Sequence, residues 1–158
     1  MKKSLAANLE KVVGKNALDS SGPMPTVTPK DENGLAAFLK YASAGKLRVM
    51  VVGGGTMPEP VCLDETVRLS LAGLNAVRDL SAGDSVVVAQ TGTIADDAVK
   101  AAEKERMLLP LDPTSGAKST VGGAYMTAAV GPYAAGYGPF RDAVIGVRCL
   151  TAGGDAVT

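Results

Sequence analysis

The distribution of glycine restricts the folding of this chain more than any other feature of its sequence. The 158 residues include 19 glycines, which are concentrated in Gly53–Gly55, Gly122–Gly138 and Gly153–Gly154. Glycine adopts positive φ without strain and leaves room for close contact. These glycines do not form a repeat. They therefore indicate tight turns, or backbone that closely approaches another group, rather than a low-complexity segment.

The residue types that the chain lacks exclude several kinds of site. It has no histidine, and its two cysteines are Cys62 and Cys149. The chain alone therefore cannot form a Ser-His-Asp triad, a histidine metal site or a four-cysteine cluster, and we expect no metal. Sixteen basic residues balance sixteen acidic ones, which argues against a nucleic-acid partner. Redox chemistry here would need a bound cofactor.

The sequence also gives expectations about location. No stretch approaches 18 apolar residues, so no transmembrane segment is expected. The charged N-terminal residues do not form a signal peptide, and the two cysteines are expected to be reduced thiols in the core of a cytoplasmic protein. Gly153-Gly154-Asp155 predicts a hairpin turn, after which the chain stops within three residues. We therefore expect a piece of a longer protein, or a sheet that a partner completes.

Apolar periodicity predicts a mixture of helices and strands. Helices are expected over 2–13, 35–44, 93–102 and 121–130, and strands over 48–52, 67–71, 76–80, 85–89, 108–111 and 144–150. Thr93 is the expected N-cap of the third helix, with Asp96 as its partner. Adjacent strands combined with isolated helices predict an α+β fold with two small lobes.

The first candidate site is the loop after the strand at 48–52. That strand is almost entirely apolar, which predicts a buried strand, and it runs directly into Gly53-Gly54-Gly55-Thr56. Consecutive glycines can present bare N–H groups to phosphate oxygens. Pro58 and Pro60 prevent a helix from starting there, so the loop is neither a P-loop nor a Rossmann fingerprint. The alternative is a flexible turn.

The second candidate site combines a proline-rich segment with a glycine turn. Pro110 and Pro113 flank Asp112, and Ser119 and Thr120 precede Gly122-Gly123 at a predicted helix start. Hydroxyl and backbone donors at such a turn suit anionic or polar ligand atoms. An ordinary loop in which Thr120 is the N-cap is the alternative. Further along, Arg141-Asp142 is expected to be a structural pair, and a carboxylate clamp by Arg141 is the less favoured interpretation.

The order of these motifs resembles the FAD-binding domain of the vanillyl-alcohol-oxidase/p-cresol-methylhydroxylase superfamily (PCMH type), in the branch of glycolate oxidase subunits and D-lactate dehydrogenases. The resemblance runs from about Leu9 to the last residue. Its blocks are Leu9–Gly14, Thr28-Pro29, Gly53–Thr56, Leu71–Leu80, Val87–Thr93, Leu109–Pro113, Thr120–Gly123, Tyr137–Asp142 and Val144–Gly146.

The resemblance implies a set of residues that bind FAD. The first loop would hold the pyrophosphate, and the later segments would line the flavin and its ribityl chain. The implied residues are Gly53, Gly54, Gly55, Thr56, Pro110, Asp112, Ser119, Thr120, Gly122, Gly123 and Gly131. Because some relatives attach FAD through histidine and this chain has none, the FAD is expected to be noncovalent. A Gly122→Val change is expected to abolish FAD binding and to leave the fold mostly intact.

The chain also departs from the family pattern. Many relatives have asparagine where this chain has Ala124 and Ala128, and Met57–Pro60 replaces smaller residues. The family domain normally continues beyond the part seen here, so the second lobe is expected to be truncated. The expected segments are an N-terminal helix and linker at 1–22, a first lobe at 23–80 and an incomplete second lobe at 81–158.

The resemblance implies the FAD-binding part of an oxidoreductase that oxidises a small 2-hydroxy acid by hydride transfer to FAD. The substrate-capping domain would lie outside this chain, so no catalytic residue is named and the chain alone is expected to be inactive. Iron–sulfur or other oxidase subunits are the implied partners, through which the protein could be peripheral to a membrane. The alternative is a noncatalytic accessory subunit, or a degenerate domain, that serves assembly.

Overall fold

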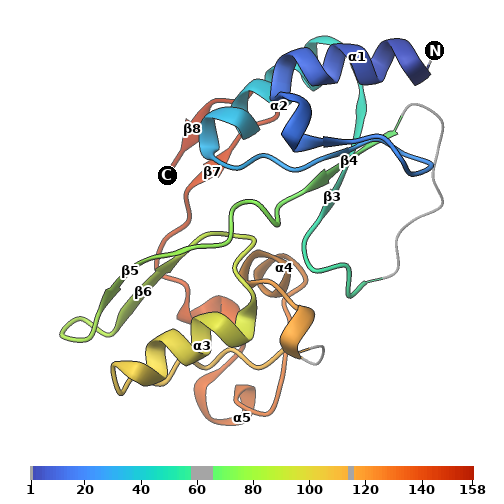
Figure 1. The fold of residues 1–158 in the computed structure, drawn as a ribbon. Helices are drawn as coiled ribbons and strands as arrows, with labels where there is room; N and C mark the ends of the chain where they lie inside the picture. The colour runs from blue at the N-terminus through green and yellow to red at the C-terminus, as the bar shows by residue number, and fades with distance from the viewer. Residues whose placement is uncertain (1, 58–65, 114–115) are drawn as a thin grey trace. The chain divides into compact units, whose positions relative to one another are not determined.

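The computed structural model describes residues 2–57, 66–113 and 116–158 (Figure 1). The α+β fold expected from the sequence is confirmed. The chain forms two compact units, and we describe each by itself. The first contains the described residues of 1–52, 59–73 and 146–158, and the second those of 53–58 and 74–145.

The residue boundaries of these two units differ from those of the segments expected from the sequence. The N-terminal helix belongs to the first unit together with the residues that follow it. The glycine loop belongs to the second unit, not to the first lobe, and the last 13 residues return to the first unit. The units are therefore discontinuous in sequence, and no boundary near residue 80 separates them.

The first unit contains a four-stranded sheet with two helices. The strand order is β1-β2-β4-β3, in which β1 and β2 are antiparallel and the pairs β2–β4 and β3–β4 are parallel. The strands are β1 (Leu18–Asp19), β2 (Thr26–Val27), β3 (Arg48–Val52) and β4 (Thr66–Ser70). The helices are α1 (Lys2–Val13) and α2 (Glu32–Ala44), with a 3₁₀ turn at Lys15–Ala17. Both helices were predicted from the sequence.

Helix α2 is defined by its ends and by its apolar face. The Asp31 carboxylate accepts a hydrogen bond of 2.7 Å from the Gly34 N–H, which caps the first turn. The helix ends at Gly45. Its inner face buries Phe38 and Ala42. These side chains form the core of the first unit with Leu9, Val27, Val67 and Leu69.

Strand β3 is more exposed than its apolar sequence predicts. Val51 is 60% exposed, and the other residues of the strand are exposed or half-buried. The sheet order explains this difference, because β3 is the last strand of the sheet among the described residues and pairs there with β4 alone. The β3–β4 ladder nevertheless runs in register to Val52↔Ser70, so it fixes the point at which the glycine loop begins.

The C-terminal hairpin confirms the turn predicted at Gly153–Asp155. Strands β7 (Cys149–Leu150) and β8 (Ala156–Val157) are antiparallel. The hairpin contacts α2, since a Cβ on Gly154 would lie 2.6 Å from the Ala36 carbonyl. Just before β7, the Arg148 guanidinium donates to the Glu32 carboxylate in the first turn of α2, at 2.6 Å. This ion pair links the hairpin to the start of the helix.

We expect the Glu32–Arg148 pair to be visible as a shifted titration. The hydrogen bond from Arg148 lowers the pKa of Glu32. Such a group adds stability at pH values above its pKa in the unfolded chain, and the contribution is lost as the pH falls through the lower pKa of the folded chain. Replacing Arg148 by glutamine should therefore raise the pKa of Glu32 to its ordinary range, measured by NMR of the side-chain carboxyl.

The matched control for this change is Arg48→Gln, which removes an exposed arginine from β3 in the same unit. It should leave the Glu32 titration unchanged. Both partners of the pair are about half exposed, so 0.5 M salt should also move the pKa of Glu32 upward in the unmodified chain. A Glu32 titration that is the same with and without Arg148 would contradict the pairing.

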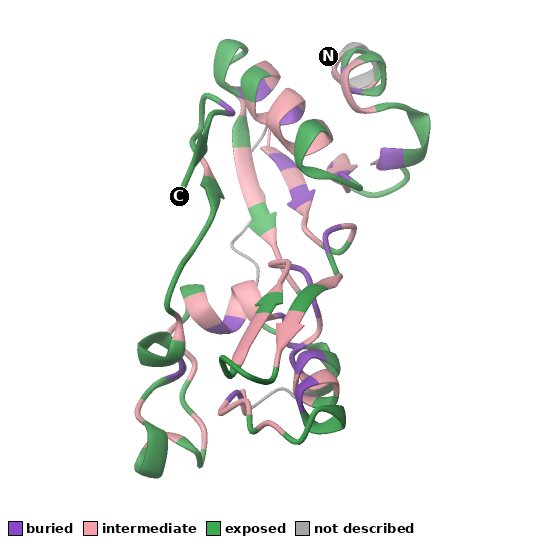
Figure 2. Cartoon of the chain, turned by 90° about the vertical axis from the view of Figure 1, so that its left-hand side faces the viewer, coloured by how far each residue is buried: buried purple, intermediate pink, exposed green. Residues whose placement is uncertain are grey.

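The second unit contains one β-ribbon and several short helices. The ribbon pairs β5 (Val77–Ser81) with β6 (Val86–Ala89) in antiparallel orientation. The helices are α3 (Ala95–Lys104), α4 (Val121–Met126) and α5 (Ala134–Tyr137), with 3₁₀ turns at Gly116–Lys118 and Phe140–Ala143. A small buried core joins Ala95 of α3, Leu111, Ala124 of α4 and Phe140. Figure 2 colours the buried parts of the chain purple.

Several predicted elements of this region are corrected by the structure. Residues 108–111 are not a strand, because Pro110 has no N–H and the Leu111 N–H bonds locally to the Leu109 carbonyl at 2.8 Å. The helix expected at 121–130 ends at Met126. The strand expected at 144–150 is reduced to Cys149–Leu150.

Two single-residue predictions are also wrong. Ile94, not Thr93, is the N-cap of α3, because the Thr93 hydroxyl donates instead to the Ala76 carbonyl at 3.2 Å. Cys149 is an exposed free thiol rather than a core residue, since it lies in the short C-terminal hairpin. Cys62 and the segment Pro58–Pro60 lie outside the described residues.

Candidate functional site

The glycine loop after β3 packs against residues 118–120. A Cβ on Gly54 would fall on the carbonyl oxygen of Lys118. A Cβ on Gly53 would lie 2.6 Å from the Thr120 hydroxyl oxygen. The two segments that the sequence singled out separately therefore touch within the second unit. Glycine is favoured at both positions because the Lys118 backbone approaches Gly54 and the Thr120 side chain approaches Gly53 so closely.

Gly55 differs from the two glycines before it. Its φ is +66°, and no described residue lies within 4 Å of the position that a Cβ would take. Positive φ is the conformation that nests of backbone N–H groups use to bind anions. Among the backbone hydrogen bonds between described residues, none is donated by the N–H groups of Gly53, Gly54 or Gly55. These N–H groups are therefore candidate donors to a ligand anion.

The start of α4 uses its donors internally, which corrects the expectation that this turn offers N–H groups to a ligand. The Val121 N–H donates to the Thr93 carbonyl, and the Gly122 N–H donates to the Thr91 carbonyl, both at 2.8 Å. The Gly123 N–H donates to the Thr120 hydroxyl oxygen at 3.1 Å. Thr120 is therefore the N-cap of α4, as one of the two sequence interpretations held.

Gly122 is packed against the protein rather than against open space. A Cβ at this position would collide with the Thr91 hydroxyl, and it would lie 2.8 Å from the Thr91 carbonyl oxygen. Substitution of Gly122 thus acts first on the fold. This finding corrects the expectation that Gly122→Val would remove FAD binding and leave the fold mostly intact.

The hydroxyls of Ser119 and Thr120 are the buried polar groups beside the loop. Ser119 is 7% exposed and Thr120 is 3% exposed. The Ser119 carbonyl accepts from the Ala95 N–H of α3 at 2.8 Å, which holds this segment against the helix. The Thr120 oxygen accepts from Gly123, so its O–H proton remains available to a further acceptor.

The structure brings Asp112 and Gly131 together in a second group. A Cβ on Gly131 would collide with the carbonyl and the side chain of Asp112, and the Tyr133 N–H donates to the Asp112 carboxylate at 2.8 Å. Asp112 thus braces the turn after α4. Pro110 is half-buried two residues earlier, and Leu111 between them packs in the core of the unit.

Arg141 is structural, as the favoured sequence interpretation held. Its guanidinium donates to the carbonyls of Tyr125 at 2.6 Å and Met126 at 2.8 Å, at the end of α4. It also lies over the Tyr125 ring, 5.4 Å from the centroid. A cation here neutralises the free carbonyls at a helix C-terminus. With these partners, Arg141 is not a substrate clamp.

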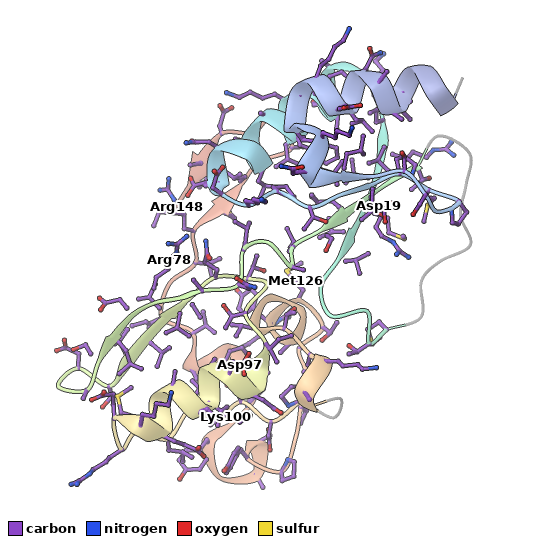
Figure 3. All side chains as sticks on the ribbon, viewed as in Figure 1. Asp19, Arg78, Asp97, Lys100, Met126 and Arg148 are labelled. Atoms are coloured by element: carbon purple, nitrogen blue, oxygen red, sulfur yellow. The ribbon has the colours of Figure 1, made fainter. Side chains whose placement is uncertain are left out.

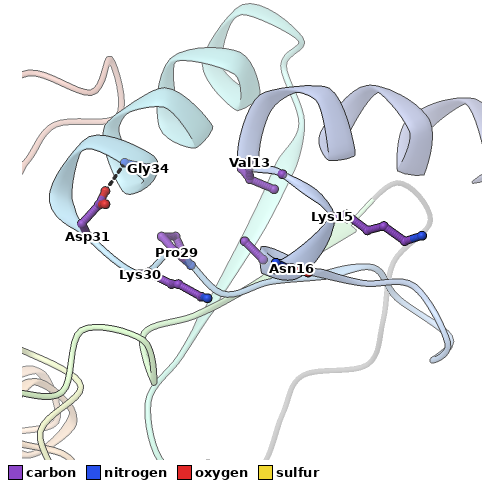
Figure 4. A pocket seen from close by; sticks show the side chains of 9 residues that line it. Val13, Lys15, Asn16, Pro29, Lys30, Asp31 and Gly34 are labelled. Atoms are coloured by element: carbon purple, nitrogen blue, oxygen red, sulfur yellow. Dashed lines mark hydrogen bonds between the residues drawn. The ribbon is translucent and has the colours of Figure 1, made fainter.

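A separate cavity lies in the first unit, between the end of α1 and the start of α2 (Figure 4). Its volume is about 340 Å³. Its lining residues are Val13, Gly14, Lys15, Asn16, Ala17, Pro29, Lys30, Asp31 and Gly34. None of the predicted FAD-binding residues belongs to it. The Asp31 carboxylate at this cavity is already engaged as the cap of α2.

The geometry also shows two residues that the sequence did not single out as site residues. Thr91 supports the glycine turn through its carbonyl and hydroxyl, and Lys118 covers Gly54 with its carbonyl. Thr91 lies within Val87–Thr93, a motif of the family resemblance, so this motif could have pointed to Thr91 as a site residue. Nothing in the sequence connects Lys118 with Gly54, which lies 64 positions earlier, because their contact is made only by the tertiary fold.

Comparison with known proteins identifies the family. The model of a family described as an FAD binding domain matches residues 23–158, which is most of the chain. The chain belongs to this FAD binding domain family. The expected resemblance to PCMH-type flavoproteins is confirmed. Its residues fit the FAD pyrophosphate, because the loop at Gly53–Gly55 combines open N–H donors, a positive φ and the absence of side chains.

Curated relatives cover a common set of flavin oxidoreductases. The domain is 28% identical to D-2-hydroxyglutarate dehydrogenase of Stutzerimonas stutzeri over 90% of the chain and 32% of that protein. It is 27% identical to glycolate oxidase subunit GlcD of Bacillus subtilis over 87% of the chain and 30% of that protein. It is 32% identical to D-lactate dehydrogenase of Anaerostipes hadrus over 78% of the chain and 26% of that protein. The chain thus spans about a third of the length of these relatives.

Solved structures support the fold. The domain superposes on 6-hydroxy-D-nicotine oxidase from Arthrobacter nicotinovorans with a TM-score of 0.76 at 22% identity, over 96% of the chain and 33% of that protein. An alkyldihydroxyacetonephosphate synthase gives a TM-score of 0.76 at 23% identity, over 84% of the chain and 25% of that protein. Within the described residues, no His, Cys, Asp and Glu cluster could hold a metal ion, and no helix is long and apolar enough to cross a membrane.

Proposed function

We propose that this domain holds FAD noncovalently, with the pyrophosphate at the loop Gly53–Thr56. The observation that carries the proposal is the set of N–H groups at Gly53–Gly55, which donate to no described backbone carbonyl in a segment that bears no side chains. The buried hydroxyls of Ser119 and Thr120 lie beside this loop and would orient polar atoms of the cofactor. The absence of histidine supports noncovalent attachment.

The remaining predicted residues act as supports in this proposal. Gly122 and Gly123 let α4 start against Thr91 and Thr120, so they hold the hydroxyl of Thr120 at a defined place. Asp112 and Gly131 fix the turn that follows α4. Pro110 restricts the backbone before Asp112. Preorganised groups of this kind lower the cost of ordering the site when the cofactor binds.

We propose further that the whole protein oxidises a small 2-hydroxy acid. When bound, FAD supplies a hydride-accepting group for such an oxidation. The support is that the names of the curated relatives include a D-2-hydroxyglutarate dehydrogenase, a glycolate oxidase subunit and a D-lactate dehydrogenase. The substrate-binding part would lie outside this chain. The partners in this proposal are iron–sulfur or other oxidase subunits, and the location is the cytoplasm. The residues that select the substrate and the electron acceptor would lie in those other parts of the protein.

Titration of the chain with FAD tests the first proposal. We expect quenching of the flavin fluorescence on binding, and full release of the flavin when the complex is denatured with acid, because no covalent bond is formed. The measurement is fluorescence titration followed by a precipitation assay. A chain that is folded by circular dichroism but leaves FAD fluorescence unchanged would contradict cofactor binding. Flavin that remains with the precipitate would contradict noncovalent attachment.

An accessory role in assembly is the second candidate. Ala124 is 2% exposed in the core of the second unit, so it presents no polar group where many relatives carry asparagine. Met126 and Ile145 of the same unit are 72% and 84% exposed, so an assembly role would place a partner over them. Size-exclusion chromatography with candidate subunits discriminates between the two functions, since an assembly role predicts a complex that forms equally well without FAD.

A further inference from the structure

Lys118 occupies a special place beside the glycine loop. It is the last residue of the 3₁₀ turn Gly116–Lys118, and its carbonyl oxygen is the nearest heavy atom to the Cβ position of Gly54. The next two residues, Ser119 and Thr120, are buried, and Ser119 is bonded to α3. The backbone of Lys118 is therefore held against the loop, while its side chain is exposed to solvent.

The loop itself carries no charge to balance a pyrophosphate. Residues 53–57 are three glycines, a threonine and a methionine. Arg141 of the same unit is engaged by the carbonyls at the end of α4. Lys100 and Lys104 belong to α3, where Figure 3 labels Lys100. Lys118, in contrast, touches the loop through its own backbone, and its flexible four-carbon stem lets the ammonium reach past that contact.

We infer that the Lys118 ammonium pairs with the FAD pyrophosphate held at Gly53–Thr56. This inference rests on the proposed function and adds a cation to the N–H donors of the loop. Lysine binds phosphate as a point charge without strict geometry, which suits an exposed side chain on a fixed backbone. Because the side chain is exposed, salt screens the attraction, so this part of the affinity should depend on ionic strength.

The test compares Lys118→Gln with the unmodified chain. We expect the Kd for FAD to rise about tenfold at low salt, which corresponds to the loss of one charge-assisted hydrogen bond. The Kd for ADP, which carries the pyrophosphate without the flavin, should rise by a similar factor. Riboflavin carries no phosphate, so its affinity should not change. The Kd for FAD should also depend less steeply on NaCl concentration in Lys118→Gln.

Two further variants control the experiment. Lys104→Gln removes a lysine from the end of α3 and should bind FAD like the unmodified chain. Lys118→Arg keeps the charge and should retain most of the affinity. If the unmodified chain binds FAD and Lys118→Gln has the same FAD affinity and salt dependence, the role of Lys118 is overturned and the proposed function stands. Unmodified chain that binds no FAD would overturn the proposed function, and with it this inference.

Discussion

Replacing Gly54 by alanine should disrupt the glycine loop and its cofactor site together. The new Cβ would fall on the Lys118 carbonyl, which is a backbone atom and cannot rotate away as a side chain can. The loop or the segment at 118–120 must therefore move. We expect the free energy of unfolding to fall by about 1–3 kcal/mol, the usual cost of forcing extra atoms into a packed site. FAD affinity should fall at least tenfold because the N–H donors move with the loop.

The matched control for Gly54→Ala is Gly83→Ala, in the exposed turn between β5 and β6. No atom lies within 4 Å of the Cβ position of Gly83, so this variant should retain its stability and its FAD affinity. Denaturant unfolding and flavin fluorescence titration measure both quantities. A Gly54→Ala chain that matches Gly83→Ala in both measurements would show that the loop is not packed on Lys118.

Gly122→Ala is the second change with a large expected effect. Its Cβ would collide with the Thr91 hydroxyl and approach the Thr91 carbonyl, which also accepts the Gly122 N–H. We expect a loss of about 1–3 kcal/mol in the free energy of unfolding. Loss of FAD binding should follow from the displaced Thr120. Measured without FAD, the stability loss reports the internal clash alone, whereas added FAD would stabilise the unmodified chain and not the variant.

Two further variants separate the clash from other effects at Gly122. Gly136→Ala in α5 meets nothing within 4 Å and should be neutral or slightly stabilising, since alanine is the better helix former. The double variant Gly122→Ala with Thr91→Ala removes the Thr91 hydroxyl, which is the nearest atom to the new Cβ, and should recover part of the stability if the side chain is the main obstacle. Equal stability of Gly122→Ala and the unmodified chain would contradict the packing described here.

Local signals in the sequence were sufficient for much of the fold. The helices α1 and α2 and strand β3 follow from short-range periodicity and from Gly45, and the C-terminal hairpin follows from Gly153–Asp155. Strand 108–111 was a false prediction, because an apolar run next to prolines has the composition of a strand but lacks the N–H groups of one. The cap at Thr93 failed because its hydroxyl had a tertiary acceptor in Ala76.

The candidate site was predicted as a set of segments, and the structure decided what each residue does in it. Sequence motifs singled out Gly53–Gly55 and Ser119–Gly123, and the family match supports an FAD binding domain. Motifs could not show that Gly53, Gly54 and Gly122 are glycine because of contacts within the protein. Among the candidate site glycines, only Gly55 combines positive φ with a Cβ position that no described residue approaches within 4 Å.

The sequence by itself determined the class of the protein, through the order of its glycine motifs and the absence of histidine. These are properties of the chain that need no knowledge of distant contacts. Only the tertiary structure decided that the glycine loop belongs to the second unit, that it rests on the Lys118 carbonyl, and that the donors at the start of α4 are already used. The physical reason is that such contacts join residues tens of positions apart, and a residue's type does not specify which distant backbone it will meet.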